Sequence, residues 1–202
     1  SARVLLVMDL ETKKPIILSG TADYARIVQF FWLNDERIGF YKQPTRGLDA
    51  YDLWAIDIDG KNLKKLVPGK WEDGYATGAS VSFLMDDDPD HVLVEYNKRR
   101  PKYTDIYKLN IYSGRLTTLA VDPVLGNNTL MGWAIDQQGN VRGYMAMDGL
   151  KYKLYHRNDV NKDFELLREF TYQEAMFMPQ TYDYDPRYCL LYTSDAADDY
   201  RS

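Results

Sequence analysis

Residues 53–66 read LWAIDIDGKNLKKL, and this stretch decides the fold. Leu53–Ile58 has the apolar alternation of a strand with one buried face. Asp59-Gly60 follows, and these are residue types that accept the positive φ of a tight hairpin turn. The stretch therefore predicts a strand over Leu53–Ile58, a turn at 59–62 and a short return strand.

The same pattern recurs at intervals of about 50 residues. A shift of 53 residues brings it onto 106–119, where apolar residues coincide at six positions. A shift of 48 residues in the other direction brings it onto 5–18, and a weaker copy covers 154–167. Self-similarity at such a period is the signature of a repeat architecture.

A second kind of hairpin lies between these copies. Each has an apolar strand, a turn rich in Asp, Asn or Gly, and another apolar strand; they occupy 27–41, 81–94, 130–144 and, incompletely, 176–187. Two hairpins per period make four strands, the composition of a propeller blade. The sequence thus predicts an all-β fold, a partial β-propeller of four-stranded antiparallel blades over residues 1–188. A closed propeller typically needs 4–8 blades, so roughly three to four blades predict an open arc.

Composition narrows the classes of function. The chain has 202 residues, 45% hydrophobic, and a formal net charge of −5, which argues against nucleic acid or an anionic membrane as partner. No apolar run approaches the roughly 20 residues of a membrane helix. The first residues, SARVLLVMD, enter strand-like sequence without an initiator Met, and we expect a start inside a longer protein.

The C-terminal tail differs from everything before it. Residues 189–198 read CLLYTSDAAD, and the string TGT CTC TTA TAC ACA TCT GAC GCT GCC GAC, a transposase adapter of sequencing libraries, encodes them in order. We expect residues 189–202 to be an artefactual adapter-derived tail and assign no chemistry to Cys189. The alternative is a genuine strand, because Leu190-Leu191-Tyr192 is compatible with β-structure.

No catalytic residue is predicted. The nearest string to a G-x-S-x-G nucleophile elbow, at 78–82, lacks the second glycine and precedes no helix. His91 and His156 are the only histidines, and both lie in strand or strand-edge sequence, where a half-exposed structural histidine is the more common finding.

No metal or cofactor is predicted either. The acidic stretches 57–60 and 86–90 carry the oxygen ligands that calcium prefers, but they fall where the repeat requires turns. The basic run 98–102 joins two strands of one blade and is predicted to be a solvated loop. Trp32, Trp54 and Trp133 occupy strand positions and are predicted to pack between blades.

Four motifs, in order, carry a resemblance to the propeller of bacterial prolyl-oligopeptidase-family serine peptidases of the dipeptidyl-peptidase and acylaminoacyl-peptidase kind. They are similar to the family's W-x-N-x-E-R, D-x-D-x-V-L-V, D-V-Y-R-L-N and D-x-x-G-x-V-R elements, at 32–38, 88–94, 105–115 and 136–142. The resemblance covers about residues 3–188.

The resemblance implies a two-domain enzyme. Its propeller covers a C-terminal α/β-hydrolase domain, which holds the Ser-Asp-His triad, and restricts access to short peptides. None of the triad motifs occurs in this chain, so the portion at hand should be inactive. Members commonly carry signal peptides, which favours the periplasm or the exterior over the cytoplasm. The partners implied are the hydrolase domain of the same chain and short peptides.

Two other functions stay open. A stand-alone propeller similar to those of the periplasmic translocation system would present a loop face to partner proteins. A propeller with its own active site in the central channel would need convergent carboxylates or histidines, most of which the repeat already explains. The sequence downstream separates the first two, since only a peptidase continues into a G-x-S-x-G domain.

Overall fold

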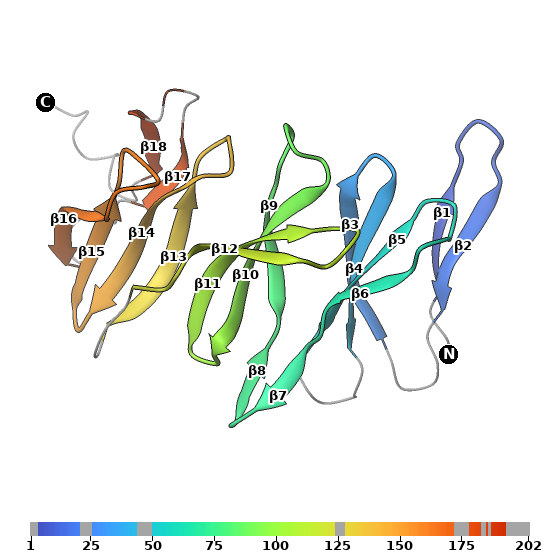
Figure 1. The fold of residues 1–202 in the computed structure, drawn as a ribbon, viewed down its shortest axis with the longest axis horizontal. Helices are drawn as coiled ribbons and strands as arrows, with labels where there is room; N and C mark the ends of the chain where they lie inside the picture. The colour runs from blue at the N-terminus through green and yellow to red at the C-terminus, as the bar shows by residue number, and fades with distance from the viewer. Residues whose placement is uncertain are drawn as a thin grey trace, which may run out of the picture. The chain divides into compact units, whose positions relative to one another are not determined.

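The structure is a computed structural model that describes residues 4–20, 26–43, 50–123, 128–171, 178–182, 185 and 187–192. These residues form strands, turns and loops. They contain no helix, and therefore no helix that could span a membrane. The chain divides into two compact units, Ser1–Val121 and Asp122–Ser202. Figure 1 shows the strands of each.

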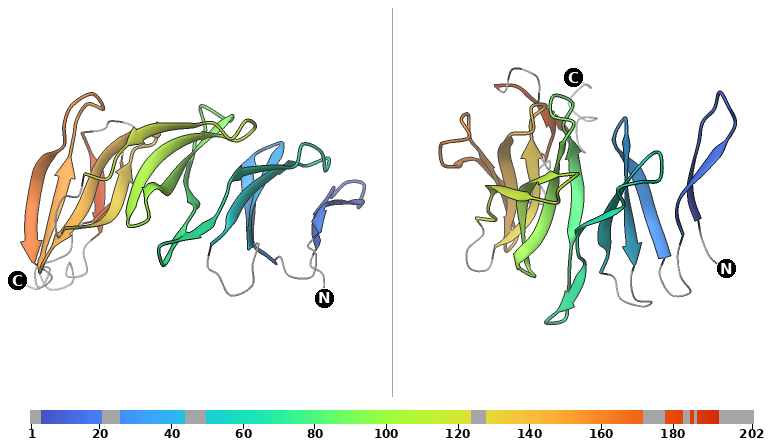
Figure 2. Two further views of the ribbon diagram at one scale, coloured as in Figure 1. Left: turned by 60° about the horizontal axis from the view of Figure 1, so that its bottom comes forward. Right: turned by 45° about the vertical axis from the view of Figure 1, so that its right-hand side comes forward.

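The first unit contains two complete four-stranded antiparallel sheets, which we call blade A and blade B. Each is a meander in which sequential strands are neighbours, as Figure 2 shows from two sides. Blade A consists of β3 (Arg26–Asn34), β4 (Arg37–Gln43), β5 (Asp52–Asp57) and β6 (Lys64–Val67). Blade B consists of β9 (Ala79–Leu84), β10 (His91–Arg100), β11 (Tyr103–Asn110) and β12 (Leu116–Ala120).

Two further hairpins belong to this unit. β1 (Val4–Met8) pairs with β2 (Pro15–Gly20) and is the first copy of the repeat. β7 (Lys70–Glu72) and β8 (Tyr75–Thr77) form a short ribbon in the connection from blade A to blade B.

The second unit repeats the pattern. A four-stranded antiparallel sheet is built from β13 (Thr129–Ile135), β14 (Val141–Asp148), β15 (Lys151–His156) and β16 (Glu165–Thr171). β17 (Met178–Tyr182) pairs with β18 (Cys189–Tyr192), so the β-compatible start of the tail lies in a strand.

The predicted hairpin turns are confirmed. Gly60, Gly114 and Gly139 have φ values of 83°, 76° and 79°, a region that favours glycine. The Gly60 amide donates to the Asp57 carbonyl and the Gly114 amide to the Asn110 carbonyl, both at 2.9 Å. Strands β5 and β11, and with them the all-β fold of four-stranded antiparallel blades, follow the sequence pattern closely.

The main hydrophobic core lies between blades A and B. We call this cluster 1: blade A contributes Leu33, Leu53, Ala55, Leu66 and Val67, and blade B contributes Ala79, Val92, Val94, Tyr96, Tyr107, Leu109 and Ile111. Cluster 2 lies between blade A and the β1–β2 hairpin and contains Leu5, Leu18, Ile27, Ile38, Phe40 and Ile56. Burial of these faces supplies the main stabilisation of the stack.

The tryptophans only partly meet expectation. Trp54 packs against cluster 2, between blade A and the β1–β2 hairpin, as predicted. Trp133 packs instead within its own sheet, against Tyr144 and Phe164. Trp32 is 53% exposed and belongs to neither cluster, which contradicts the prediction of blade packing.

Candidate functional site

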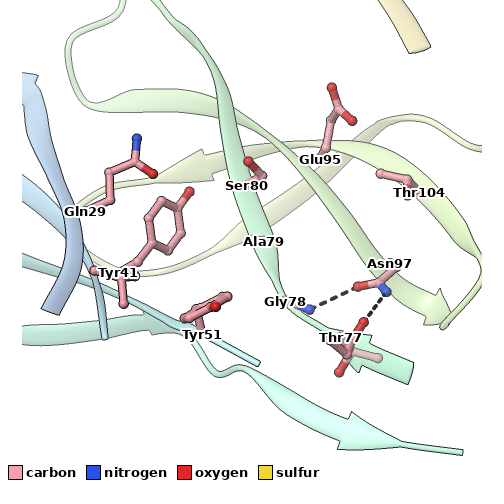
Figure 3. A pocket seen from close by; sticks show the side chains of 12 residues that line it. Gln29, Tyr41, Tyr51, Thr77, Gly78, Ala79, Ser80, Glu95, Asn97 and Thr104 are labelled. Atoms are coloured by element: carbon pink, nitrogen blue, oxygen red, sulfur yellow. Dashed lines mark hydrogen bonds between the residues drawn. The ribbon is translucent and has the colours of Figure 1, made fainter. Parts of the chain in front are cut away.

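A cavity of about 460 Å³ lies between the inner strands of blades A and B. Its lining residues come from β3, β4, β8, β9, β10 and β11 and from the connections at Tyr51 and Gly78, and Figure 3 shows the labelled side chains around it. Its polar side chains are Gln29, Tyr41, Tyr51, Thr77, Ser80, Glu95, Asn97 and Thr104. The site is therefore assembled from strands of both blades, and neither blade could form it alone.

Asn97 fixes one wall of this cavity. Its Oδ1 accepts the Gly78 amide at 3.0 Å, while its Nδ2 donates to the carbonyls of Ala76 and Pro101 at 2.9 Å each. The chain between β8 and β9 is thereby tied to the end of β10. Gly69 fits closely behind this wall, because a Cβ there would stand 2.5 Å from the backbone of Tyr51.

Glu95 is the charged group of the cavity. Burial raises the pKa of its carboxyl above the usual value, and the carboxylate has neither a hydrogen bond nor an ion pair within the described part of the chain. Burial also raises the pKa of the Tyr41 phenol, whose oxygen accepts the Val81 amide at 2.7 Å. A half-buried carboxyl beside hydroxyl and amide groups suits the binding of a polar or cationic group.

The two histidines lie elsewhere, and their bonds are structural. His91 begins β10, and its Nδ1 lies 2.8 Å from Oδ1 of Asp88, which also pairs with Lys108 at 2.6 Å. His156 ends β15, where Nε2 lies 3.0 Å from Oδ1 of Asn158. Neither histidine has a serine hydroxyl among its hydrogen-bond partners in the described residues.

The acidic and basic stretches behave as turns and hairpin ends. Asp57 ends β5, residues 58–60 and 86–90 lie in turns, and the described residues contain no group of three metal-binding side chains. In the basic run, Arg99 forms two hydrogen bonds of 3.1 Å with Asp105, a fully buried residue. One residue of the basic run, Arg99, thus forms an ion pair with a buried carboxylate. The prediction of a wholly solvated loop is wrong for this residue.

The motif at 32–38 links the blades. Arg37 is only 1% exposed, and its Nε donates to the Ile111 carbonyl of blade B at 2.9 Å. Asn34 reaches the same blade, donating to the Pro89 carbonyl at 3.0 Å and the Tyr112 hydroxyl at 3.1 Å. The sequence analysis did not predict that Asn34 and Arg37 link the blades, and it did not predict a role for Glu95. The signal that could have identified Arg37 and Glu95 is a charged residue inside an otherwise apolar strand pattern.

Comparison with known proteins gives one curated similarity and several similar structures. No family model matches the chain. The chain is 31% identical over 100 residues to dipeptidyl aminopeptidase BIII of Pseudoxanthomonas mexicana, a stretch covering 49% of this chain and 14% of that protein.

Among solved structures, a prolyl endopeptidase aligns with a TM-score of 0.58 at 16% identity, over 90% of this chain and 28% of that one. An oligogalacturonate lyase of Vibrio parahaemolyticus aligns at 0.48 and 16% identity, over 82% of this chain and 42% of that one. The chain thus spans less than half of each of these proteins. Its described sheets are β-propeller blades of the kind that a prolyl endopeptidase contains.

Proposed function

We propose that this chain is the non-catalytic propeller portion of a prolyl-oligopeptidase-family serine peptidase. Its role is to gate the access of short peptides to an α/β-hydrolase domain C-terminal to it in the same polypeptide. The observation that carries the proposal is the 31% identity to a dipeptidyl aminopeptidase over 100 residues, in a chain whose sheets are propeller blades.

Gating requires blades that do not separate easily. In the first unit, cluster 1 joins blades A and B through side chains that are almost fully buried, including Leu53, Val92, Val94 and Leu109. Arg37 and Asn34 add hydrogen bonds across the same boundary. Apolar packing reinforced by polar bonds, one of them buried, resists opening, and such a wall excludes folded or long substrates.

The cavity supports contact with a passing peptide. Peptides present amide donors and acceptors, and often a terminal ammonium group. Gln29 and Ser80 offer hydrogen-bonding groups, and Glu95 offers a carboxylate, all in a recess of about 460 Å³. In this proposal the recess orients short peptides and the hydrolase domain performs the chemistry.

The test uses the complete reading frame of the parent gene. Expressed whole, the protein should hydrolyse chromogenic dipeptide and tripeptide substrates and leave a 30-residue peptide intact. Doubly substituted N34A/R37A protein should gain activity on the long peptide, because the bonds between blades A and B are lost. Arg115→Ala, an exposed position in the turn before β12, is the matched control.

Two outcomes would contradict the proposal. One is a reading frame that ends after further blades, without a G-x-S-x-G segment; the stand-alone binding propeller would then be favoured. The other is an active peptidase whose length preference is the same in the wild type and in N34A/R37A.

A further inference from the structure

A second recess lies beside the candidate site, between the same two blades. Its volume is about 480 Å³. The described residues that line it come from β6 of blade A, from the β7–β8 ribbon, and from β10, β12 and the turn after β10 in blade B. Thr77 and Asn97 line both recesses and form their common wall. All of these residues lie within 66–116, so two complete blades define the recess and neither end of the chain does.

Tyr96 brings a hydroxyl without a partner into this recess. The residue is 7% exposed and belongs to cluster 1, where its ring lies 6.0 Å from that of Tyr107. The Tyr107 hydroxyl donates to Asp105 at 3.3 Å, whereas the Tyr96 hydroxyl has no hydrogen bond within the described residues. It is not sealed in the core, because the only fully enclosed side-chain polar atom without a partner in the described structure is Nε1 of Trp54. A buried hydroxyl without a partner costs free energy, which a ligand that bonds to it recovers.

Burial keeps the Tyr96 hydroxyl protonated. It raises the pKa of this phenol, and the Glu72 carboxylate raises that pKa further. A protonated phenol donates a hydrogen bond, and a carboxylate or carbonyl oxygen is the acceptor that this one lacks. The recess therefore presents a donor to an oxygen atom of a ligand.

The charged side chains of the recess leave one cation and one carboxylate without a counterion. Lys70 and Glu72 pair with each other at 3.6 Å, and Arg99 bonds to a buried carboxylate of β11. Lys98 and Asp73 are exposed, and neither side chain has an ion pair or a hydrogen bond in the described part of the chain. The recess thus offers one ammonium and one carboxylate to an occupant that carries the opposite charges.

The recess also has an apolar wall. Leu66 and Val67 of β6 are 7% and 1% exposed and belong to cluster 1, against which Leu116 of β12 packs. An apolar side chain placed on this wall leaves water, which favours binding. The volume falls within the range of small-ligand sites, about 300–1,000 Å³.

We propose that this recess binds a short free peptide with an apolar C-terminal residue. The carboxylate of the peptide accepts the Tyr96 hydroxyl and pairs with Lys98, its terminal ammonium pairs with Asp73, and its last side chain packs on the apolar wall. A segment inside a protein chain carries neither terminal charge, so the two unlike charges favour a free peptide over a folded partner. The inference concerns binding alone and stands independently of any peptidase activity.

The probe is the dipeptide alanyl-leucine, titrated into the isotope-labelled 202-residue chain and followed by heteronuclear NMR. We expect saturable binding. Tyr96→Phe should weaken it about tenfold, because a hydrogen bond to a charged acceptor is lost. Lys98→Gln and Asp73→Asn should each weaken it about threefold, as single exposed ion pairs predict. Asparagine suits position 73, where φ is 50°.

Two blocked forms of the probe separate its charges. Alanyl-leucine amide lacks the carboxylate, so Lys98→Gln should not weaken its binding further. N-acetyl-alanyl-leucine lacks the ammonium, so Asp73→Asn should not weaken its binding further. Lys64→Gln is the matched control, because this exposed lysine of β6 does not line the recess, and its variant should bind alanyl-leucine as the wild type does.

Tyr96→Phe also checks the fold. It keeps the ring in cluster 1 and removes an unpaired hydroxyl, so the urea midpoint of the ligand-free chain should stay the same or rise. A lower midpoint would overturn the proposal, because the hydroxyl would then be bonded within the fold.

Three further results would overturn it. One is the absence of saturable binding by the wild-type chain. Another is equal affinity for alanyl-leucine and its two blocked forms. The third is binding that Glu95→Gln abolishes and that the three substitutions in the second recess leave unchanged, which would assign the dipeptide to the first recess.

Discussion

Arg37 binds the main chain of Ile111 across the boundary between two blades, with 2.9 Å between its Nε and the carbonyl oxygen. The same guanidinium pairs with Asp57 and donates to the Asn62 carbonyl, so its charge is satisfied although the side chain is buried. Arg142 repeats the pattern within its own sheet, with Asp136 at 2.6 Å and the Asn158 carbonyl at 2.7 Å. A buried arginine near the start of the second strand therefore occurs in two of the three described four-stranded sheets.

Replacing Arg37 with alanine should destabilise the first unit by about 3 kcal/mol. The loss has this size because it leaves the Ile111 carbonyl and the Asp57 carboxylate without their partner. Urea unfolding followed by tryptophan fluorescence would measure it. The exposed Arg115→Ala variant should lie within about 0.5 kcal/mol of the wild type. A loss for Arg37→Ala as small as that of Arg115→Ala would contradict a structural role for this bond.

Glu95 should make stability fall as pH rises. Burial raises the pKa of its folded-state carboxyl above the ordinary value of a glutamate. The contribution of Glu95 to the free energy of unfolding is therefore complete below the pKa that this carboxyl has in the unfolded chain. It is lost as the pH rises through the pKa of the folded state, because the pocket disfavours the carboxylate. Glu95→Gln should be more stable than the wild type at neutral pH and equal to it at pH 3. The exposed Glu11→Gln variant is the control, and a difference independent of pH would refute this cause.

The chain should not be labelled by a serine-directed phosphonate and should not cleave chromogenic dipeptides. A serine hydroxyl is a poor nucleophile without a base and an oxyanion hole placed around it. Both histidines bond to neighbouring Asp, Asn or Tyr side chains, and His91 and His156 belong to different sheets. The assay should use protein ending at residue 188. Stoichiometric labelling of one serine, lost in His91→Ala or His156→Ala, would show a catalytic site in these blades.

The source DNA should match the transposase adapter base for base from the codon of Cys189. The first residues of the tail form a strand opposite β17, as β-compatible sequence does regardless of its origin. Resequencing of the gene from an independent library decides the matter. If synonymous codons occur there, or if the same ten residues appear in an independently cloned gene, residues 189–202 are native.

The fold was predictable because its signals are local and repeated. The hairpins at 53–66 and 106–119, with Gly60 and Gly114 in their turns, needed only strand alternation and turn chemistry to be recognised. The period of about 50 residues then gave four strands per sheet. The backbone of each hairpin pairs with residues close to it in sequence, so a single sequence carries the information.

The candidate site was not predictable, because its residues meet only when two blades stack. Gln29, Tyr41, Glu95 and Asn97 come from three strands of two sheets and share no motif. Likewise, Arg37 and Ile111 are 74 residues apart in the sequence. An arginine on the surface and an arginine buried between two blades look the same in the sequence. The sequence by itself determined which strands form and how they order within a sheet. Tertiary packing alone decided which polar side chains were buried together, because burial depends on the facing blade.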